Sequence, residues 1–208
     1  MEKIYIVGAS GFGREVAWLI EQLGTYNIAG FVDDNEKIQN SFINGLQVVG
    51  KIEYLINIKT MCNVVIAIAN PNIRQRIAEK LQENTCLRFP NIIAKNANMS
   101  KYVELGVGNV ICDNTIITTN VKIGSFNHLN LSCTIGHDAV LADYITVYPS
   151  VNISGAVSID NYSELGTGSK IIQGINITNS VIIGAGSVVI RDLQDSGTYV
   201  GIPVKRIK

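Results

Sequence analysis

Proton transfer is the chemistry best suited to one short segment of this sequence, Ile135-Gly136-His137-Asp138. A neutral imidazole accepts a proton from an attacking nucleophile near neutral pH, and an adjacent carboxylate stabilises the imidazolium that results. His137 is one of only two histidines in the chain. The residues by themselves leave two interpretations open, a general base and a plain surface histidine, and they favour the second.

A second segment has the layout of a nucleotide site. The glycine turn Gly8-Ala9-Ser10-Gly11-Phe12-Gly13 follows a short apolar run and precedes a helical pattern, and Asp33 and Asp34 come about twenty positions later. Glycines let the backbone approach a phosphate, and a helix N-terminus favours negative charge. The aspartates could accept hydrogen bonds from a ribose or a base. A merely structural turn is the alternative, and the layout favours nucleotide binding.

A six-residue repeat indicates the element that must position His137. Every sixth residue from 93 to 189 is large and aliphatic: Ile93, Met99, Leu105, Ile111, Ile117, Ile123, Leu129, Ile135, Leu141, Val147, Ile153, Ile159, Leu165, Ile171, Ile177, Ile183 and Val189. In a helix these side chains would spread over every face, and no single strand is so long. Hexapeptide repeats that stack as a parallel β-helix account for the pattern.

The repeat also predicts which residues stack. Three hexapeptides make one coil, so residues eighteen apart lie one above the other, in about five coils without inserted loops. Gly155 then lies above His137 and should leave open space over the imidazole for a narrow acyl donor. Thr119 lies below His137, while His128 lies below Thr146, so the two histidines occupy different corners. Small residues four positions after each aliphatic residue should let the chain turn.

The residues before the repeat alternate between strands and helices. Strands are predicted at residues 3–7, 28–32 and 64–68, and helices at residues 12–23 and 71–81. This order predicts a small parallel sheet, about half of a doubly wound nucleotide-binding domain. It is too small to hold a hydride-transfer site as well, which argues against a dehydrogenase. We therefore expect two domains, residues 1–90 and 91–208, the second ending in a tail at residues 191–208.

Composition narrows the partners. The 17 basic and 17 acidic residues balance, and no Lys/Arg run suggests nucleic-acid binding. The N-terminus lacks the architecture of a signal peptide, and no apolar stretch approaches the roughly 18 residues that a membrane span needs. The four cysteines have no metal-ligand spacing, which predicts buried thiols and no metal. We expect a cytoplasmic protein without membrane insertion.

Together, the glycine-turn domain, the hexapeptide coils, Ile-Gly-His-Asp, Ser154-Gly155-Ala156-Val157 and the ending Gly201-Ile202-Pro203-Val204-Lys205-Arg206 resemble a known family. The chain is similar over nearly its whole length to the sugar O-/N-acyltransferases of the sialic-acid O-acetyltransferase type. These include the N-acetyltransferases of nucleotide-linked 4-amino-4,6-dideoxy sugars. The resemblance implies a left-handed β-helix, a homotrimer, acetyl-CoA as cosubstrate, and active sites in clefts between subunits.

The resemblance also assigns residues. The family's catalytic base falls on His137, and its acidic partner, commonly glutamate, falls on the shorter Asp138. Backbone amides at three positions would contact acetyl-CoA: Gly155, Thr167 and Ala185. The nucleotide pocket would use five residues: Ser10, Gly11, Phe12, Asp33 and Asp34. Where many relatives carry a second histidine near the acetyl group, this chain has Thr146, whose hydroxyl could bond the thioester carbonyl; His128 of a neighbouring subunit is the alternative.

The predicted function is acetyl transfer from acetyl-CoA to a nucleotide-linked amino sugar in bacterial surface-glycan biosynthesis, by direct attack with His137 as general base. Two alternatives remain: O-acetylation of a free sugar such as sialic acid, and a non-catalytic β-helix that acts as a binding module. The residues do not identify the sugar, the base of its nucleotide, or whether nitrogen or oxygen is acylated.

Overall fold

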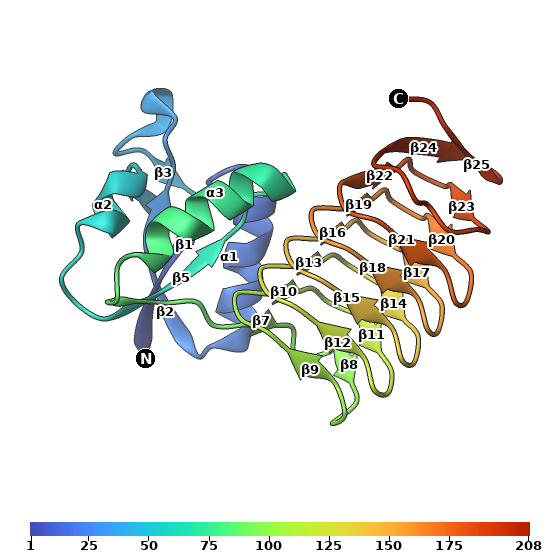
Figure 1. Cartoon of the computed structure of the whole chain (residues 1–208). Helices are drawn as coiled ribbons and strands as arrows, with labels where there is room; N and C mark the ends of the chain where they lie inside the picture. The colour runs from blue at the N-terminus through green and yellow to red at the C-terminus, as the bar shows by residue number, and fades with distance from the viewer. The chain divides into compact units, whose positions relative to one another are not determined.

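The computed structural model describes all residues from 1 to 208, and the chain divides into two compact units, Met1–Ile92 and Ile93–Lys208 (Figure 1). The first is an α/β unit and the second is a stack of β-coils. None of the helices combines the length and the apolar character that crossing a membrane requires.

The first unit is built on one six-stranded sheet, with strand order β3-β4-β2-β1-β5-β6. Its elements are β1 (Glu2–Val7), α1 (Gly11–Leu23), β2 (Tyr26–Val32), η1 (Glu36–Ile38), β3 (Phe42–Ile43), β4 (Leu46–Gly50), α2 (Ile52–Ile56), β5 (Cys62–Ile66), α3 (Pro71–Gln82) and β6 (Leu87–Arg88). Strand β1 is central and runs parallel to β2 and β5. The carboxyl ends of these three strands therefore meet at one edge of the sheet.

The predicted elements of this unit are confirmed, with small changes in their ends. Helix α1 ends at Gly24, which has the left-handed conformation that glycine adopts easily (φ 66°). Helix α3 begins at Pro71, and the side chain of Asn70 caps it by accepting a hydrogen bond from the Ile73 amide. The sequence analysis missed the antiparallel hairpin of β3 and β4. Its turn, Asn44-Gly45, has positive φ at both residues, which is a recognisable hairpin signal.

The second unit is the predicted parallel β-helix. Its eight-stranded sheet contains β7 (Ile92–Ile93), β10 (Val110–Ile111), β13 (His128–Leu129), β16 (Thr146–Val147), β19 (Glu164–Leu165), β22 (Val181–Ile183), β24 (Gly197–Gly201) and β25 (Val204–Arg206). Its six-stranded sheet contains β8 (Asn98–Met99), β11 (Ile116–Ile117), β14 (Thr134–Ile135), β17 (Asn152–Ile153), β20 (Lys170–Ile171) and β23 (Val188–Val189). Its five-stranded sheet contains β9 (Glu104–Leu105), β12 (Lys122–Ile123), β15 (Val140–Leu141), β18 (Ser158–Ile159) and β21 (Asn176–Ile177).

Strand pairing in the coils follows the eighteen-residue spacing. Leu129 pairs with Val147, and Ile135 pairs with Ile153, each one coil further along the chain. The aliphatic residues of the repeat are buried from Ile111 onward and line the interior. The small residues four positions later are buried with them: Thr115, Val121, Asn127, Cys133, Ala139, Val151, Val157, Ser163, Ser169, Val181 and Ser187. Each six-residue repeat therefore supplies one strand and the corner that follows it.

The corners contain a second six-residue series that the sequence analysis did not detect. Every sixth residue from Gly108 to Gly186 has a positive φ, between 54° and 76°. Glycine and asparagine adopt this conformation at low cost, but the series also includes Phe126, Tyr144 and Tyr162. These three rings stack along one corner, with centroids 5.4 Å and 5.7 Å apart. Asp138, the expected partner of His137, belongs to the same series.

Candidate active site

His137 and Asp138 lie at the corner between β14 of the six-stranded sheet and β15 of the five-stranded sheet. Nδ1 of His137 lies 2.8 Å from Oδ2 of Asp138. A carboxylate accepts hydrogen bonds, so this contact places the ring hydrogen on Nδ1 and leaves Nε2 as the free base. The side chains are 53% and 56% exposed, so a substrate can reach the pair from outside the coil.

The backbone at Asp138 is left-handed, and its carboxylate, shorter than that of glutamate, still reaches the ring of His137. Its φ of 60° lies in the left-handed region, which aspartate tolerates better than residues with longer side chains. Its pKa is held below the ordinary value, first by the hydrogen bond with His137 and then by one with the Asn120 side chain. Asp138 is therefore ionised at neutral pH and can stabilise a protonated imidazole.

The expectation of open space above His137 is wrong. Gly155 does lie one coil above, and the Ala156 amide donates a hydrogen bond to the His137 carbonyl at 2.7 Å. However, a Cβ atom at Gly155 would come within 2.6 Å of both Cε1 and Nε2 of His137. The imidazole itself fills the space that the missing side chain leaves. Gly155 thus provides the surface on which the ring rests, and a donor must approach beside the ring.

The two further residues considered for the acetyl group are both buried. His128 and Thr146 pair across β13 and β16, as the eighteen-residue spacing predicts, and are 1% and 0% exposed. The expectation that His128 occupies a corner is wrong, because it lies on a strand of the eight-stranded sheet. A residue without exposed surface contacts a bound thioester only after a local rearrangement. Neither the Thr146 hydroxyl nor a contribution of His128 to a neighbouring copy gains support from this burial, and both stay predictions.

Thr167 and Ala185 lie at another corner of the coil, between the eight- and six-stranded sheets, where the Gly186 amide donates to the Thr167 carbonyl at 2.8 Å. We call such a set of stacked residues, eighteen apart in sequence, a column. Both residues are exposed. His137, Asp138 and Gly155 lie together at the opposite end of the six-stranded sheet. A donor that contacts both columns crosses the outer face of that sheet or lies between two copies of the chain.

The glycine turn of the first unit connects β1 to α1. Gly8 has a φ of 99°, and a Cβ atom at Gly13 would overlap the Gly8 carbonyl oxygen. Glycine at position 13 therefore lets the helix start directly against the turn. Ser10 occupies the N-cap position without a side-chain capping bond, and Ser10 and Gly11 are exposed beside the half-buried Phe12. The amide groups of this helix start are suited to an anionic group.

Asp33 and Asp34 brace the loops around this turn. Oδ2 of Asp33 accepts a hydrogen bond from the Ala9 amide at 2.9 Å, and its Oδ1 accepts one from Asn35 at 2.9 Å. Oδ1 of Asp34 accepts from the Ile52 amide, also at 2.9 Å. Backbone hydrogen bonds therefore orient both carboxylates before any ligand arrives. Oδ2 of Asp34 makes no hydrogen bond within the chain.

These aspartates border a small apolar cavity at the carboxyl edge of the sheet. Its other lining residues are Val7, Gly8, Val32, Ile52, Ile68, Ile73 and Ile77. An adjoining groove shares Asp34, Ile52, Ile73 and Ile77 and adds two cations of α3, Arg76 and Lys80. The sequence analysis missed these α3 residues, although its helix from residue 71 begins at this edge. An apolar slot with acceptors on one side and cations on another suits a nucleotide.

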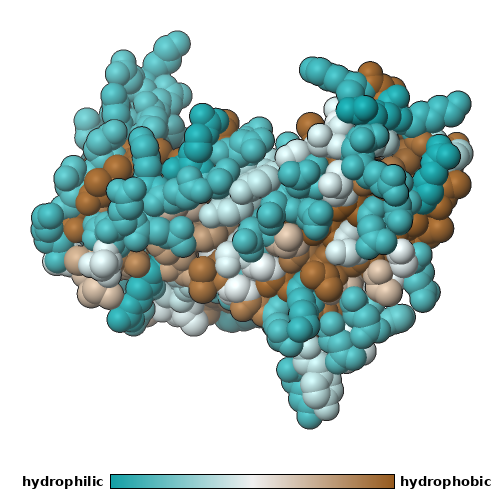
Figure 2. Space-filling view, viewed as in Figure 1, coloured by the Kyte–Doolittle hydropathy of each residue, from teal (hydrophilic) through white to brown (hydrophobic).

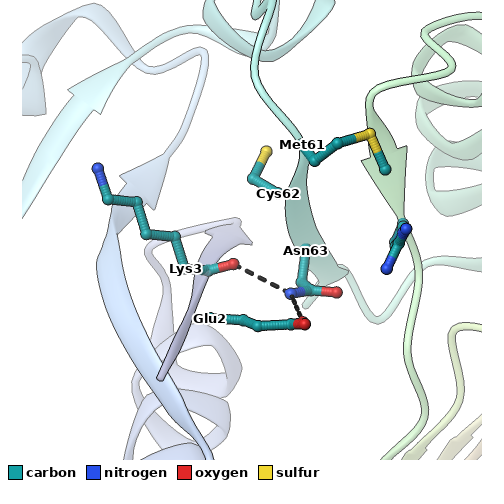
Figure 3. A pocket seen from close by; sticks show the side chains of 6 residues that line it. Glu2, Lys3, Met61, Cys62 and Asn63 are labelled. Carbon is teal, nitrogen blue, oxygen red and sulfur yellow. Dashed lines mark hydrogen bonds between the residues drawn. The ribbon is translucent and has the colours of Figure 1, made fainter.

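A separate groove in the same unit lies at the opposite edge of the sheet, where the parallel strands begin. It is lined by Glu2, Lys3, Met61, Cys62, Asn63 and Arg88, at the amino ends of β1 and β5 (Figure 3). This groove and the apolar cavity beside Asp33 each have a volume of about 180 Å³, so size does not distinguish them. The Asn63 amide donates to the Glu2 carboxylate and the Lys3 carbonyl, as the dashed lines in Figure 3 show. Parallel sheets bind ligands at their carboxyl edge, which favours the cavity beside Asp33.

The chain matches known proteins over both units. The PglD N-terminal domain family matches residues 3–81. The GDP-perosamine N-acetyltransferase of Escherichia coli O157:H7 is 33% identical over 195 residues, which cover 87% of this chain and 82% of that protein. A serine acetyltransferase of Synechococcus elongatus is 35% identical over 136 residues, but the chain spans only 52% of its length.

Solved structures extend the likeness to the three-dimensional fold. The acetyltransferase domain of PglB from Neisseria gonorrhoeae, solved with acetyl coenzyme A, has a TM-score of 0.92, 28% identity, and 99% coverage of both chains. The perosamine N-acetyltransferase of Caulobacter crescentus, solved with CoA and GDP-perosamine, has a TM-score of 0.93 and 27% identity. That match covers 100% of this chain and 98% of the other. In this chain, no group of three or more His, Cys, Asp or Glu side chains converges to hold a metal ion.

Proposed function

Because this chain belongs to the hexapeptide-repeat N-acetyltransferases of nucleotide-linked amino sugars, we propose that it acetylates the amine of such a sugar with acetyl-CoA, using His137 as general base. The observation that carries the assignment of the base is the 2.8 Å contact between His137 and Asp138. It leaves Nε2 unprotonated on an exposed ring that Gly155 supports from above.

In the proposed reaction the sugar amine attacks the thioester carbonyl carbon and forms the C–N bond. Nε2 of His137 accepts the proton that the amine loses, while Asp138 stabilises the imidazolium. Collapse of the tetrahedral intermediate breaks the C–S bond, and the imidazolium returns the proton to the leaving thiolate. Direct transfer is favoured over an acyl-enzyme, because the side-chain hydrogen bond of the His137 ring goes to Asp138 and not to a cysteine or serine that could act as nucleophile.

The first unit would bind the nucleotide. The apolar cavity would take the base, with Asp34 and its unpaired Oδ2 at the rim. The backbone amides of Ser10 and Gly11, two exposed residues, and the cations of α3 are suited to the diphosphate. Position and charge support these roles, and the proposal assigns Ser10, Gly11, Phe12, Asp33 and Asp34 to the nucleotide sugar.

The proposal includes a homotrimer with sites between subunits. The donor residues lie in two columns at different corners of one chain, Gly155 in one and Thr167 with Ala185 in the other. Figure 2 shows hydrophobic residues at the surface of the coils. Large apolar side chains left exposed in the chain include Ile116, Val140, Ile172 and Ile190. Exposed apolar residues on a coil are suited to burial against another copy.

We further propose that the enzyme acts in the cytoplasm, in bacterial surface-glycan biosynthesis. All four cysteines are free, which suits a reducing compartment. The glycan assignment rests on the relatives whose substrate is a nucleotide-linked amino sugar.

Release of free CoA thiol tests the reaction. The protein is incubated with acetyl-CoA and a panel of GDP-, UDP- and dTDP-linked amino sugars, free sialic acid, and serine. We expect thiol release with one class of nucleotide-linked amino sugar, and a product with one acetyl amide by mass spectrometry. Release only with free sialic acid would replace the proposal with O-acetylation of a free sugar. No release with any acceptor would favour the non-catalytic binding module.

A further inference from the structure

Asn120 lies one coil below Asp138 and makes the second side-chain contact of its carboxylate. Its Nδ2 donates a hydrogen bond to Oδ1 of Asp138 at 3.3 Å, while Oδ2 of the same carboxylate contacts His137. The Thr119 hydroxyl donates to Oδ1 of Asn120 at 3.4 Å, which orients the amide. Asn120 and Asp138 both have left-handed backbones, with φ of 56° and 60°.

We propose that Asn120 is a positioning residue for the acetyl-transfer reaction, which holds the Asp138 carboxylate so that its other oxygen stays on Nδ1 of His137. The proposal rests on the function proposed above for His137 and adds a role that lies one coil away from the base. Asn120 is not placed in contact with either substrate.

The exposure of Asp138 is the reason that it needs a second anchor. Its side chain is 56% exposed, and a carboxylate held by one hydrogen bond at the surface samples several rotamers. Above it, the equivalent corner residue is Ala156, which offers no polar side-chain atom. The side-chain amide of Asn120, one coil below, is therefore the group that restrains Oδ1 of Asp138. Both hydrogen bonds also favour the ionised carboxylate, in agreement with the lowered pKa of Asp138.

Two substitutions separate the hydrogen bond from the shape of the side chain. Asn120→Asp keeps the size but replaces the donor with a second carboxylate, and Asn120→Gly removes the side chain while keeping a positive φ accessible. Loss of one hydrogen bond should lower kcat by roughly 3- to 10-fold in Asn120→Gly. Asn120→Asp should lower it at least as much, because two carboxylates repel. KM for acetyl-CoA and for the sugar nucleotide should not change.

Asn114 supplies the matched control. It has a φ of 59° at another corner of the coil and accepts a hydrogen bond from the Asn96 side chain eighteen residues earlier, at 3.2 Å. Asn114→Gly therefore removes the same side chain from the same backbone conformation, at the corner between β10 and β11 instead of the His137 corner. It should keep wild-type kcat. Equal losses in Asn114→Gly and Asn120→Gly would mean that corner stability, rather than positioning, sets the rate.

An Asp138→Ala background tests whether Asn120 acts through the carboxylate. In that background, Asn120→Gly should have no further effect on kcat, because the group that it positions is absent. A full, independent loss there would overturn the proposal.

The ring of His137 provides a readout that does not depend on activity. The chain has only two histidines, so ¹⁵N-labelled histidine gives a simple spectrum with His128 as internal reference. Asn120→Gly and Asn120→Asp should lower the Nδ1-protonated fraction of His137, while Asn114→Gly leaves it unchanged. An unchanged tautomer with unchanged kcat would contradict the role of Asn120 alone. If His137→Ala and Asp138→Ala both keep full activity, that result would instead contradict the proposed function.

Discussion

His137 owes its orientation to three neighbours with different roles. Asp138 binds its Nδ1, Gly155 leaves room for the ring, and Asn120 restrains the carboxylate. Two of these contacts come from residues eighteen positions away from His137 or Asp138. The coil thus builds the site by stacking residues that are remote in sequence.

Replacement of His137 should remove the base. We expect His137→Ala to lower kcat by about 10²–10⁴, the usual contribution of a general base. Steady-state kinetics with acetyl-CoA and the accepted nucleotide sugar measure this loss. Turnover near that of the wild type would show that another group takes the proton.

Gly155→Ala should displace the imidazole. The new Cβ would lie within 2.6 Å of two ring atoms, so the ring must leave its position beside Asp138. We expect a loss in kcat approaching that of His137→Ala, roughly 10²-fold or more, with little change in melting temperature. The control is Gly174→Asn at the same corner, where a Cβ meets nothing within 4 Å and the φ of 76° is a left-handed conformation that asparagine tolerates. A Gly155→Ala enzyme with normal kcat would show that the ring does not rest on this glycine during turnover.

At the level of the elements, the interior of the coil contains the aliphatic side chains of the repeat and the small side chains four positions after them. Cys133 occupies one of the small positions, is 0% exposed, and donates a hydrogen bond to the Tyr148 carbonyl at 3.2 Å. Desolvation raises its pKa to about 11. The stabilisation that the neutral thiol contributes is full below the ordinary thiol pKa, about 9, and is lost as the pH rises toward 11.

Cysteine alkylation tests this burial. In the folded protein at pH 8, Cys86 is the one half-exposed thiol and should be modified first. Cys62, Cys112 and Cys133 should react only after unfolding, because buried neutral thiols are poor nucleophiles. Mass spectrometry of peptides from native and denatured samples measures the order. Modification of Cys133 as fast as Cys86 would show that the coil opens at that corner.

At the level of the whole molecule, the proposed donor residues lie in two columns at different corners of the coil, and the assembly that brings them together is testable. If the site lies between copies, His137 of one chain works with Thr167 and Ala185 of another. Sedimentation should then give a mass of three times 22.6 kDa. A monomer at assay concentrations would contradict the proposed assembly.

Mixed assemblies give a sharper test. Chains with His137→Ala and chains with Ala185→Trp should each be inactive alone, because one lacks the base and the other blocks the donor column. Co-expressed in equal amounts, they should restore roughly a quarter of the wild-type sites, those that draw an intact residue from each chain. A site contained in one chain would stay inactive in the mixture.

The sequence by itself determined the architecture of the coil and which residues stack beside His137, the proposed base. The unbroken series from Ile93 to Val189 predicts the coil, because a stacked coil buries one side chain every six residues. The same spacing correctly placed Gly155 over His137 and His128 beneath Thr146.

Only the tertiary structure decided what fills the space between stacked residues. A spacing gives the order of neighbours but neither their rotamers nor their backbone conformation. The ring of His137 therefore occupies the space expected to be open, and Thr146 is buried where an accessible hydroxyl was expected. The left-handed corners at Asn120 and Asp138, which turn their side chains toward each other, follow from φ values that no residue pattern revealed.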